Sequence, residues 1–310
     1  QEYITVVGGV NMDIGGTPFE TLVARDSNPG TVNMTPGGVG RNIAHDLALL
    51  GKSVKFISAL GDDPYAKQIK ENCNENGIDI HDSLFKNTNS TSVYLYVADE
   101  TGDMQLAIAD MKIYDDMTPE FMETRMGIIN HSEAVIVDAN IPQETIEYIV
   151  KNAKVKVFAE TVSTTKAMKF QDCLKGISCI TPNIIEAEAL SGVSVNPNSE
   201  RSLARASNIL MKKGAKKVII TLSKDGAYYA DRNGKGLIPA LENNPINTTG
   251  AGDALIAGVA TAITAGYNLR DSVVFGMACS SETIESEKTN NPDLTFEVAR
   301  KRAGLKRLKD

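Results

Sequence analysis

A short segment, Asn247 to Asp253, has residues whose types and spacing suit phosphoryl transfer. It reads Asn-Thr-Thr-Gly-Ala-Gly-Asp and runs directly into an apolar stretch of small residues, which predicts a helix. Two glycines flank one alanine, so the backbone can turn tightly and offer free N–H groups to an anion at the helix N-terminus. A carboxylate at the mouth of such a site, Asp253, suits a base that takes a proton from an attacking hydroxyl. The alternative for this segment alone is an ordinary turn with a solvated carboxylate.

A second polar group follows the first predicted strand, Tyr3–Val7. The chain continues Gly-Gly-Val-Asn-Met-Asp, so Asn11 and Asp13 come just after the strand. A carboxylate only accepts hydrogen bonds, and Asp13 could therefore bind two hydroxyls of a sugar. An Asx turn is the alternative interpretation.

The segment from Pro36 to Asn42 opens the first predicted helix. Bare backbone at Gly37 and Gly38, with Asn42 one turn into the helix, suits a polyhydroxyl ligand. The segment is not a dinucleotide fingerprint, because Ile43 occupies the position of the third glycine. The later run Gly-Lys-Ser at 51–53 lies where a helix ends, so we interpret it as structural and not as a P-loop.

Two further segments end strands and suit a nucleotide. Asn183 and Glu186 lie three residues apart at the start of a helix and share a face, so they could hold Mg²⁺ through water. A capping box is the alternative. The turn that contains Thr221, Ser223 and Gly226 stands where a nucleotide phosphate could rest.

The elements that must position these residues alternate between strands and helices. Asp63-Pro64 is a typical helix start, and Gly51, Gly77 and Gly214 stand where helices should stop. The alternation predicts βαβ units and an α/β fold, in which helices cover both faces of a mainly parallel sheet. The predicted strands are 3–7, 54–59, 134–138, 155–159, 177–180 and 218–222. The predicted helices are 42–50, 64–76, 145–152, 183–190, 199–213, about 251–265, and 269–285.

Two stretches, about 15–34 and 88–113, interrupt this alternation. Residues 91–97 and 104–109 predict a hairpin around Thr101-Gly102-Asp103. Because both stretches leave the core near strand ends, we expect a single domain, 1–310, with a discontinuous β lid over the ligand. Ser27, Asn28 and Asp110 are the lid residues that we expect to contact the substrate. Exposed lid edges also favour a homodimer.

The last predicted helix, 269–285, is rich in small residues, including Ala278 and Ser281. Small side chains allow a flat ring or a neighbouring backbone to approach closely. A nucleotide-binding surface and tight helix packing are therefore both open here.

Composition excludes several classes of protein. The chain has 310 residues and a formal net charge of −7, which argues against binding of nucleic acid or an anionic membrane. No apolar run approaches the roughly 20 residues that cross a bilayer, and a predicted strand begins at Tyr3, so no signal peptide is visible. The four cysteines lack metal-site spacing and the three histidines are scattered. We therefore expect a cytoplasmic protein with reduced thiols.

Together these segments resemble the ribokinase-type (PfkB) carbohydrate kinases along essentially the whole chain. Each motif is weak alone, but five in order are specific: Gly-Gly-x-Asn-x-Asp, Pro-Gly-Gly-x-Gly-x-Asn, Pro-Asn-x-x-Glu, Thr-Leu and Thr-Gly-Ala-Gly-Asp. Within the family, the chain resembles the bacterial pseudouridine kinases most, at residues 27–30, 35–44, 47–51 and 289–294.

The resemblance implies a ribokinase-like three-layer α/β/α fold and a kinase that uses ATP and Mg²⁺. The acceptor would be the 5′-hydroxyl of a ribosyl substrate, and that substrate would be pseudouridine in the closest branch. Asp253 resembles the catalytic base, and the anion hole would be formed by the N–H groups of Gly250, Ala251 and Gly252. The implied substrate-binding residues are Asn11, Asp13, Gly37, Gly38 and Asn42. The implied nucleotide residues are Asn183, Thr221, Ser223, Gly226, Ala278 and Ser281, with Glu186 on Mg²⁺.

Three positions depart from the family pattern. Many members carry Asp where this chain has Asn247, at a position that helps to build a monovalent-cation site, so a dependence on K⁺ is disfavoured. Ser223 replaces the glycine that follows Thr-Leu. Val39 replaces the lysine of ribose kinases, which disfavours free ribose as the substrate.

Three functions compete. The first is a pseudouridine kinase, the second is a kinase for another nucleoside or sugar, and the third is a sensor that binds a sugar or nucleotide without catalysis. Binding alone needs no base, so Asp253 favours an enzyme. With an ordinary Asp pKa of about 3.9, Asp253 should be ionised at neutral pH.

Overall fold

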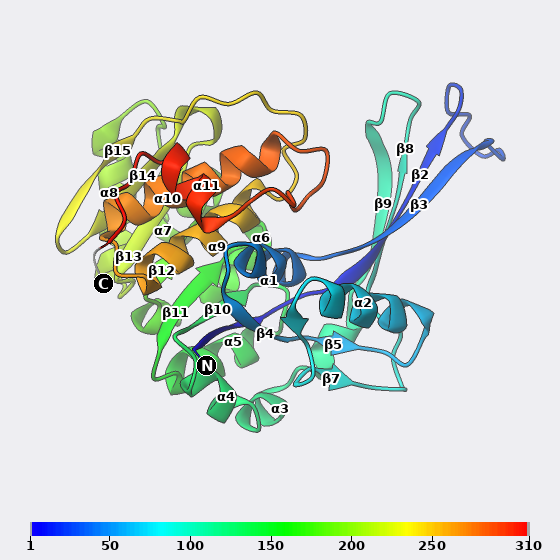
Figure 1. Cartoon of the computed structure of the whole chain (residues 1–310), viewed down its shortest axis with the longest axis horizontal. Coiled ribbons are helices and arrows are strands. Elements are labelled where there is room, and N and C mark those ends of the chain that lie inside the picture. Colours follow the sequence, from blue (N-terminus) through cyan, green and yellow to red (C-terminus); the bar gives the residue numbers. More distant parts are fainter. Residues whose placement is uncertain (1, 309–310) are drawn as a thin grey trace.

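The computed structural model describes residues 2–308, and a nine-stranded sheet forms its centre (Figure 1). All neighbouring strands are parallel except those that pair at the β13–β14–β15 end. The carboxyl ends of most strands therefore share one edge. The strands lie in the order β15 (Gly234–Ile238), β14 (Ala227–Asp231), β13 (Lys217–Thr221), β12 (Cys179–Ile180), β11 (Lys156–Glu160), β10 (Ala134–Asp138), β1 (Tyr3–Val7), β4 (Ser53–Ile57) and β6 (Ile78–Asp79).

Helices cover both faces of this sheet, which confirms the predicted three-layer α/β/α fold. One face packs against α1 (Val39–Leu49), α2 (Pro64–Glu75), α9 (Ala251–Thr264) and α10 (Leu269–Ile284). The other face packs against α3 (Pro119–Glu123), α4 (Met126–Asn130), α5 (Gln143–Asn152), α6 (Thr164–Ala167), α7 (Ile184–Ser191) and α8 (Glu200–Lys212). The last helix, α11 (Phe296–Arg302), packs on α10. Among residues 2–308, no helix has both the length and the apolar character that a membrane span requires.

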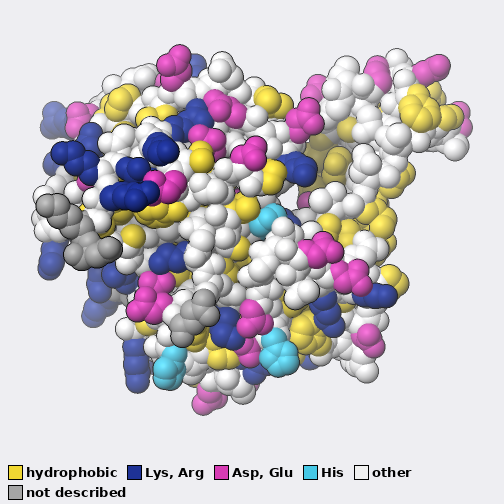
Figure 2. Space-filling model, viewed as in Figure 1, with side chains coloured by type: hydrophobic (Ala, Val, Ile, Leu, Met, Phe, Trp, Pro, Cys, Tyr) yellow, Lys and Arg dark blue, Asp and Glu magenta, His cyan; other side chains and the backbone are white. Residues whose placement is uncertain are grey.

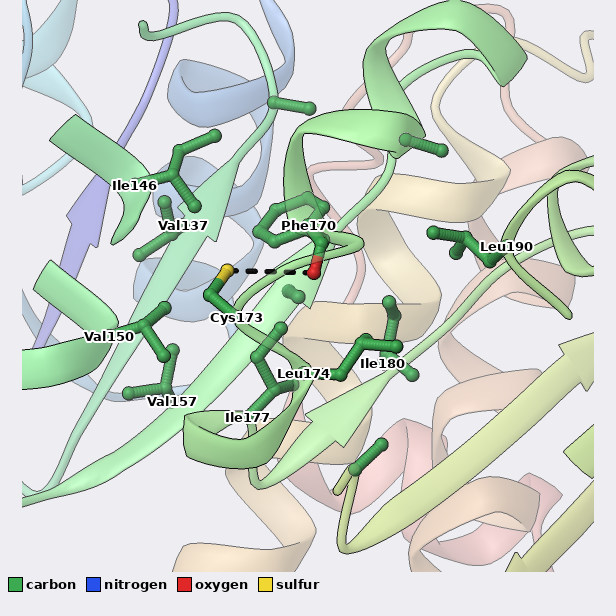
Figure 3. Close-up of a cluster of buried hydrophobic side chains, with 14 of the residues drawn as sticks. Val137, Ile146, Val150, Val157, Phe170, Cys173, Leu174, Ile177, Ile180 and Leu190 are labelled. Atoms are coloured by element: carbon green, nitrogen blue, oxygen red, sulfur yellow. Dashed lines mark hydrogen bonds between the residues drawn. The ribbon is translucent and has the colours of Figure 1, made fainter. Parts of the chain in front are cut away.

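The central strands are buried on both faces, as expected for parallel strands between helices. Figure 3 shows part of one core, where Val137 of β10 and Val157 of β11 pack with Ile146 and Val150 of α5 and with Phe170. These side chains have almost no exposed surface. The apolar interior thus leaves the strand ends as the place for polar chemistry.

A second sheet, which we call the small sheet, extends away from this core (Figure 1). Its strands lie in the order β3 (Gly30–Gly37), β2 (Asn11–Pro18), β8 (Val93–Ala98) and β9 (Met104–Asp110). The predicted hairpin between residues 91–97 and 104–109 is confirmed as β8 and β9. The first two strands reach beyond the predicted stretch of 15–34, because β2 starts as soon as the chain leaves β1. Asn11, Asp13 and Gly37 therefore belong to the small sheet.

Local signals explain where most elements begin. Asp63 accepts a hydrogen bond from the Ala66 N–H (2.9 Å) with Pro64 at the first helical position, as predicted. The first helix begins at Val39 rather than at the predicted Asn42, directly after Gly38. The β14–β15 hairpin was not predicted, because glycines interrupt its apolar alternation. A short pair, β5 (Ala59–Leu60) with β7 (Leu84–Phe85), was also missed.

Candidate active site

The glycine-rich segment forms the N-terminus of α9, as predicted. Gly250 is the residue before the helix and has φ 84°, in the left-handed region that favours glycine. A Cβ atom on Gly250 would lie 2.7 Å from the Thr289 carbonyl oxygen, so no side chain fits there. The Ala251 N–H makes only a long contact of 3.4 Å with the Thr248 carbonyl, and a Cβ on Gly252 would meet no atom within 4 Å. Backbone donors thus line open space at the positive end of a helix.

Asp253 lies in the first turn of α9 and is half-buried. The Asn42 amide donates a hydrogen bond to its Oδ2 (3.1 Å), which joins α9 to α1. The pKa of Asp253 is raised to about 7, mainly by burial; the Asn42 hydrogen bond lowers this pKa and the charge of Asp138 raises it. The expectation of an ordinary Asp pKa was therefore wrong, because the sequence does not reveal how far this carboxyl is withdrawn from water.

Asp13 and its neighbours form a polar cluster at the base of the small sheet. The Asn11 amide donates to Asp13 Oδ1 (2.7 Å), and the other carboxylate oxygen lies against Gly37, where a Cβ would come within 2.2 Å. Gly38 has φ 99° and faces the Gly9 carbonyl, so it also needs the absence of a side chain. Burial raises the pKa of Asp13, and the Asn11 hydrogen bond lowers it. The structure thus brings Asn11, Asp13, Gly37 and Gly38 together.

The three lid residues predicted to contact the substrate lie elsewhere. Ser27 and Asn28 are in the loop at the outer end of the β2–β3 hairpin (Figure 1), about 16 Å or more beyond Asp13 at the usual rise of a strand. Asn28 bonds within that loop, to the N–H (2.8 Å) and carbonyl (2.9 Å) of Val23. Asp110 pairs with Val93, so the alternation of side chains puts it on the face opposite to Asp13.

At the end of β12, Asn183 and Glu186 form the capping box that was the alternative interpretation. The Asn183 side chain accepts from the Glu186 N–H (2.8 Å), and Glu186 Oε2 accepts from the Asn183 N–H (2.9 Å). The Thr161 hydroxyl donates to the same Oε2 (2.6 Å). The capping box does not use Oε1, so the capping role leaves one carboxylate oxygen for another partner.

Thr221 lies beside Asn183, since the two residues form a parallel β-bridge, and Ser223 and Gly226 follow in the next turn. Ser223 has φ 53° and Gly226 has φ 102°. Position 223 thus has a left-handed backbone that favours glycine, which is the residue that the family resemblance implies there. The Leu222 N–H donates to the Gly226 carbonyl (2.8 Å) and closes the turn.

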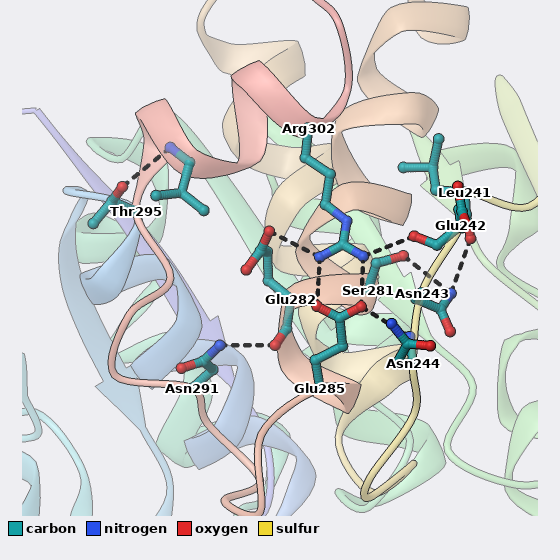
Figure 4. A network of polar contacts seen from close by, with 11 residues as sticks. Leu241, Glu242, Asn243, Asn244, Ser281, Glu282, Glu285, Asn291, Thr295 and Arg302 are labelled. Atoms are coloured by element: carbon teal, nitrogen blue, oxygen red, sulfur yellow. Dashed lines mark hydrogen bonds and ion pairs between the residues drawn. The ribbon is translucent and has the colours of Figure 1, made fainter.

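The small residues of α10 serve helix packing. A Cβ on Gly276 would lie 2.7 Å from the Leu255 carbonyl oxygen of α9, so the two backbones are in close contact. Ala278 is fully buried, and Ser281 is buried beside the Asn243 amide (3.5 Å; Figure 4). Close packing of α10 on α9 is thus present at Gly276, while Ala278 and Ser281 remain predicted nucleotide contacts.

Several functional candidates at the same sheet edge were missed. Asp138 is fully buried at the end of β10 and accepts from the Gly9 N–H (2.8 Å), which ties two strand ends together. Next to it, the Lys166 ammonium donates to Asn140 Oδ1 (2.6 Å). Polar residues directly after a predicted strand were the available signal, and it was the same signal that located Asn183.

Residues 1–295 match the family described as pfkB family carbohydrate kinase. The chain belongs to this family. Its members transfer a phosphoryl group to an alcohol, so the protein is a phosphotransferase. The predicted resemblance is confirmed at the level of the family.

Relatives and solved structures agree with this assignment. The pseudouridine kinase of Escherichia coli K12 is 37% identical over 298 residues, with 96% of this chain and 95% of that protein covered. An uncharacterized sugar kinase of the same organism, YeiI, is 33% identical over 301 residues, with 96% and 83% covered. The structure of Arabidopsis thaliana ribokinase complexed with ribose and ATP matches with a TM-score of 0.85 at 20% identity, with 98% and 99% covered. Kinases of this family thus differ in the acceptor that they phosphorylate.

Proposed function

We propose that the protein is a pseudouridine kinase, which converts pseudouridine and ATP into pseudouridine 5′-phosphate and ADP. The 37% identity to the E. coli enzyme over nearly the whole chain supports this substrate. The observation that carries the proposed chemistry is the hydrogen bond between Asn42 and Asp253 (3.1 Å). It joins the proposed sugar pocket to the helix N-terminus that would receive the transferred phosphoryl group.

In the proposed reaction, Asp253 accepts the proton of the 5′-hydroxyl. The 5′ oxygen forms a bond to the γ-phosphorus, and the bond from that phosphorus to the β,γ-bridging oxygen of ATP breaks. The N–H groups of Gly250, Ala251 and Gly252 donate to the negative oxygens of the group in transfer. Asn11, Asp13 and Asn42 hold the ribose hydroxyls, so the 5′-hydroxyl stays beside Asp253.

We infer that ATP lies along the ends of β12 and β13, near Asn183, Thr221, Ser223 and Gly226. Glu186 would hold Mg²⁺ through water by its free Oε1, and bound Mg²⁺ supplies positive charge to the phosphates. Among residues 2–308, no group of three or more His, Cys, Asp or Glu side chains could hold a metal. A single carboxylate oxygen, Glu186 Oε1, fits Mg²⁺, which is commonly bound through substrate phosphates and water rather than by several protein ligands.

The residues around Asn247 do not fit a bound K⁺ ion. The Thr249 N–H donates to Asn247 Oδ1 (3.0 Å), which fixes the orientation of the amide. Its NH₂ group then donates to the Glu287 carbonyl (3.1 Å). The Asn247 side chain thus presents a bound amide where many family members have a carboxylate, and we propose a reaction that does not require K⁺.

The small sheet supports two further parts of the proposal. Thr35, Tyr94 and Asp13 are neighbours in register and share one face, and we infer that this face closes over the ribose and excludes water. The opposite face is apolar and exposed, and Figure 2 shows hydrophobic side chains on this projecting sheet. We infer that a second copy of the chain covers it. The apolar residues are Val32, Met34, Leu95, Leu106 and Ile108.

We also infer a cytoplasmic location, because the four cysteines are all free and buried.

A panel of acceptors tests the substrate. Pseudouridine, uridine, inosine and ribose are each supplied with ATP and Mg²⁺, and kcat/KM is measured for each. We expect pseudouridine to have the highest value. Faster turnover of uridine, inosine or ribose would instead favour the kinase for another nucleoside or sugar, which the similarity to YeiI also supports.

The variant Asp253→Asn tests the base and the sensor alternative together. The amide keeps the shape of the side chain but cannot take a proton, so we expect turnover to fall at least 10³-fold, within the range for general acid–base catalysis. Calorimetry should still detect binding of the nucleoside. Turnover at the wild-type rate in this variant would refute the base assignment, and a wild-type protein that binds but does not phosphorylate would support the sensor.

A further inference from the structure

Arg41 is a charged residue in an unusual environment. It lies in α1 and only 6% of its surface is exposed. Among residues 2–308, its hydrogen bonds run to neutral side chains: Asn290 (2.8 Å), Asn42 (3.2 Å), Asn72 (2.7 Å) and His45 (3.1 Å). Burial of a guanidinium is costly unless its donors are satisfied, so this network has a defined geometry.

Asn290 is the second member of the network and is also buried. Its Oδ1 accepts from Arg41, and its NH₂ group donates to the Asn42 carbonyl (3.0 Å) and to Asp46 Oδ1 (2.8 Å). Since Arg41 can only donate, the Asn290 amide has a single compatible orientation. Asn290 therefore binds α1 by hydrogen bonds at the turn that contains Asn42.

The same logic fixes the Asn42 side chain. Its Oδ1 accepts from Arg41, so its NH₂ group must face the other way, toward Asp253 Oδ2. Without Arg41, the amide could rotate and present its oxygen to the carboxylate, which would repel it. The hydrogen bond to the proposed base thus depends on a residue that does not touch the base.

Asn290 belongs to the loop 285–293, which also supports the anion hole. The Thr289 carbonyl lies directly behind Gly250, and the Asn291 amide donates to the Glu282 carbonyl (2.7 Å). Figure 4 shows Arg302 bound to the carboxylates of Glu282 and Glu285, where α10 leads into this loop. The loop is therefore anchored to α10 and contacts both α1, through Asn290, and the N-terminus of α9, through Thr289.

We propose that Arg41 and Asn290 are positioning residues: they lock the Asn42 amide toward Asp253 and couple the loop behind the anion hole to the sugar-binding helix. This inference rests on Asp253 as the base, which belongs to the proposed function. It does not depend on which nucleoside is phosphorylated.

The hydrogen bond from Asn42 to Asp253 should affect the pH dependence of kcat. A hydrogen bond donated to a carboxylate lowers its pKa, so loss of the Asn42 contact raises the pKa of Asp253 and moves the acid limb of kcat to higher pH. The carboxyls that face Asp253 are Asp138 and Glu160 at the strand ends and Asp46 on α1. Burial raises the pKa of all three. The other ionisable groups around the network are Arg41 and His45 of α1, Asp13 of β2, Cys73 of α2 and, beside Asp46, Cys279 of α10.

The test compares Asn290→Leu with Asn291→Ala, a variant in the same loop that leaves Arg41 and Asn42 alone. We expect Asn290→Leu to lower kcat at pH 7 at least tenfold and to move the acid limb up by about one pH unit. Asn291→Ala should change the melting temperature but not the limb. Arg41→Lys retains the charge but not the planar guanidinium, so it should also lower kcat and move the acid limb to higher pH. This variant tests the positioning role if Asn290→Leu does not fold.

A double variant separates positioning from general damage. If Asn290 acts through Asn42, then Asn42→Leu with Asn290→Leu should have the same kcat as Asn42→Leu alone, within about twofold. Wild-type kcat and an unmoved limb in folded Asn290→Leu and Arg41→Lys would overturn the inference. Asp253→Asn is assayed in parallel with the best acceptor of the panel. If Asp253→Asn is inactive while Asn290→Leu has normal kinetics, the positioning role of Asn290 is refuted and the assignment of Asp253 as the base is not.

Discussion

At the scale of single residues, the proposed chemistry depends on one carboxyl that is withdrawn from water but still partly exposed. Asp253 is half-buried, and Asn42 donates to one of its oxygens. Burial raises its pKa to about 7, close to the pH at which a cell would use it. A base whose pKa is near the working pH is still substantially deprotonated and is a stronger proton acceptor than an ordinary aspartate.

The pH profile of kcat/KM should report this shift directly. The active form of Asp253 is deprotonated, so activity is present above the folded-state pKa and is lost as the pH falls through about 7. Below that point we expect a tenfold loss for each pH unit. Steady-state rates between pH 5 and 9 measure the limb, and Asp110→Asn, an exposed carboxyl of the small sheet, should leave it unchanged. A limb centred near pH 4 would contradict the raised pKa.

The second prediction for a single residue concerns Asn247. Because its NH₂ group donates to the Glu287 carbonyl, the wild-type rate should differ by less than twofold between KCl and NaCl at equal ionic strength. Asn247→Asp replaces that donor by an oxygen and frees the carbonyl, so we expect activation by K⁺ of about fivefold or more. Both effects are measured as initial rates at saturating ATP. Strong K⁺ activation of the wild-type enzyme would show that the amide does not block the site.

At the scale of elements, the site depends on glycines that let strands and helices approach each other. Gly37 ends β3 opposite Asn11, and a Cβ there would lie 2.2 Å from the Asp13 carboxylate. Gly16, in the neighbouring strand β2, has no atom within 4 Å of an added Cβ. A side chain at position 37 would therefore collide with Asp13, whereas one at position 16 would not, so Gly16 is the matched control for Gly37.

We expect Gly37→Ala to raise KM for the nucleoside at least tenfold, because the methyl group displaces Asp13 from the sugar pocket. KM for ATP should change little, since the proposed nucleotide site lies at the ends of β12 and β13 and not in the small sheet. Gly16→Ala should have wild-type kinetics and equal or slightly higher stability. Steady-state kinetics and thermal unfolding of the two variants test this, and equal KM values for the nucleoside would remove Asp13 from the proposed pocket.

Local sequence signals predicted the elements better than the contacts between them. The capping residue Asp63 and the apolar run of β10 mark their elements without help from the rest of the chain. The environment of Asp253 and the attachment of Asn290 to α1 depend instead on contacts between distant residues. Asn42 bonds to Asp253, and Asn290 bonds to Asn42. No local pattern carries such long-range pairs, so the residue types were predictable and the raised pKa was not.

The small sheet was the element whose extent was hardest to predict. Its strand β2 begins at Asn11, only a few residues after β1 ends, and the Gly-Gly pair at 8–9 between them does not tell a strand of the same sheet from the start of a second sheet. The alternation of side chains was visible, but which face meets the ligand depends on the pairing of β2 with β8. That pairing puts Tyr94 beside Asp13 and Asp110 on the other side.

At the scale of the whole molecule, the small sheet is amphipathic and stands apart from the core. Its outer face carries five large apolar side chains, and Val32 and Ile108 are 70% and 62% exposed. A single chain rarely leaves a contiguous apolar patch of this kind in water. A second copy that covers the patch would bury it and would hold the opposite, polar face over the sugar pocket.

Assembly and activity should therefore fail together when the patch is made charged. By light scattering we expect the wild-type protein to be a dimer and the double variant Leu106→Glu with Ile108→Glu to be a monomer, because paired charges across the interface would repel each other. Its KM for the nucleoside should rise, since the sheet would lose the support that holds it over the site. Leu237→Glu, an exposed apolar residue of β15 on the central sheet, should remain dimeric with normal kinetics. A wild-type monomer at micromolar concentration would leave the apolar face without its proposed partner, and a monomeric double variant with unchanged KM would show that the dimer does not support the lid.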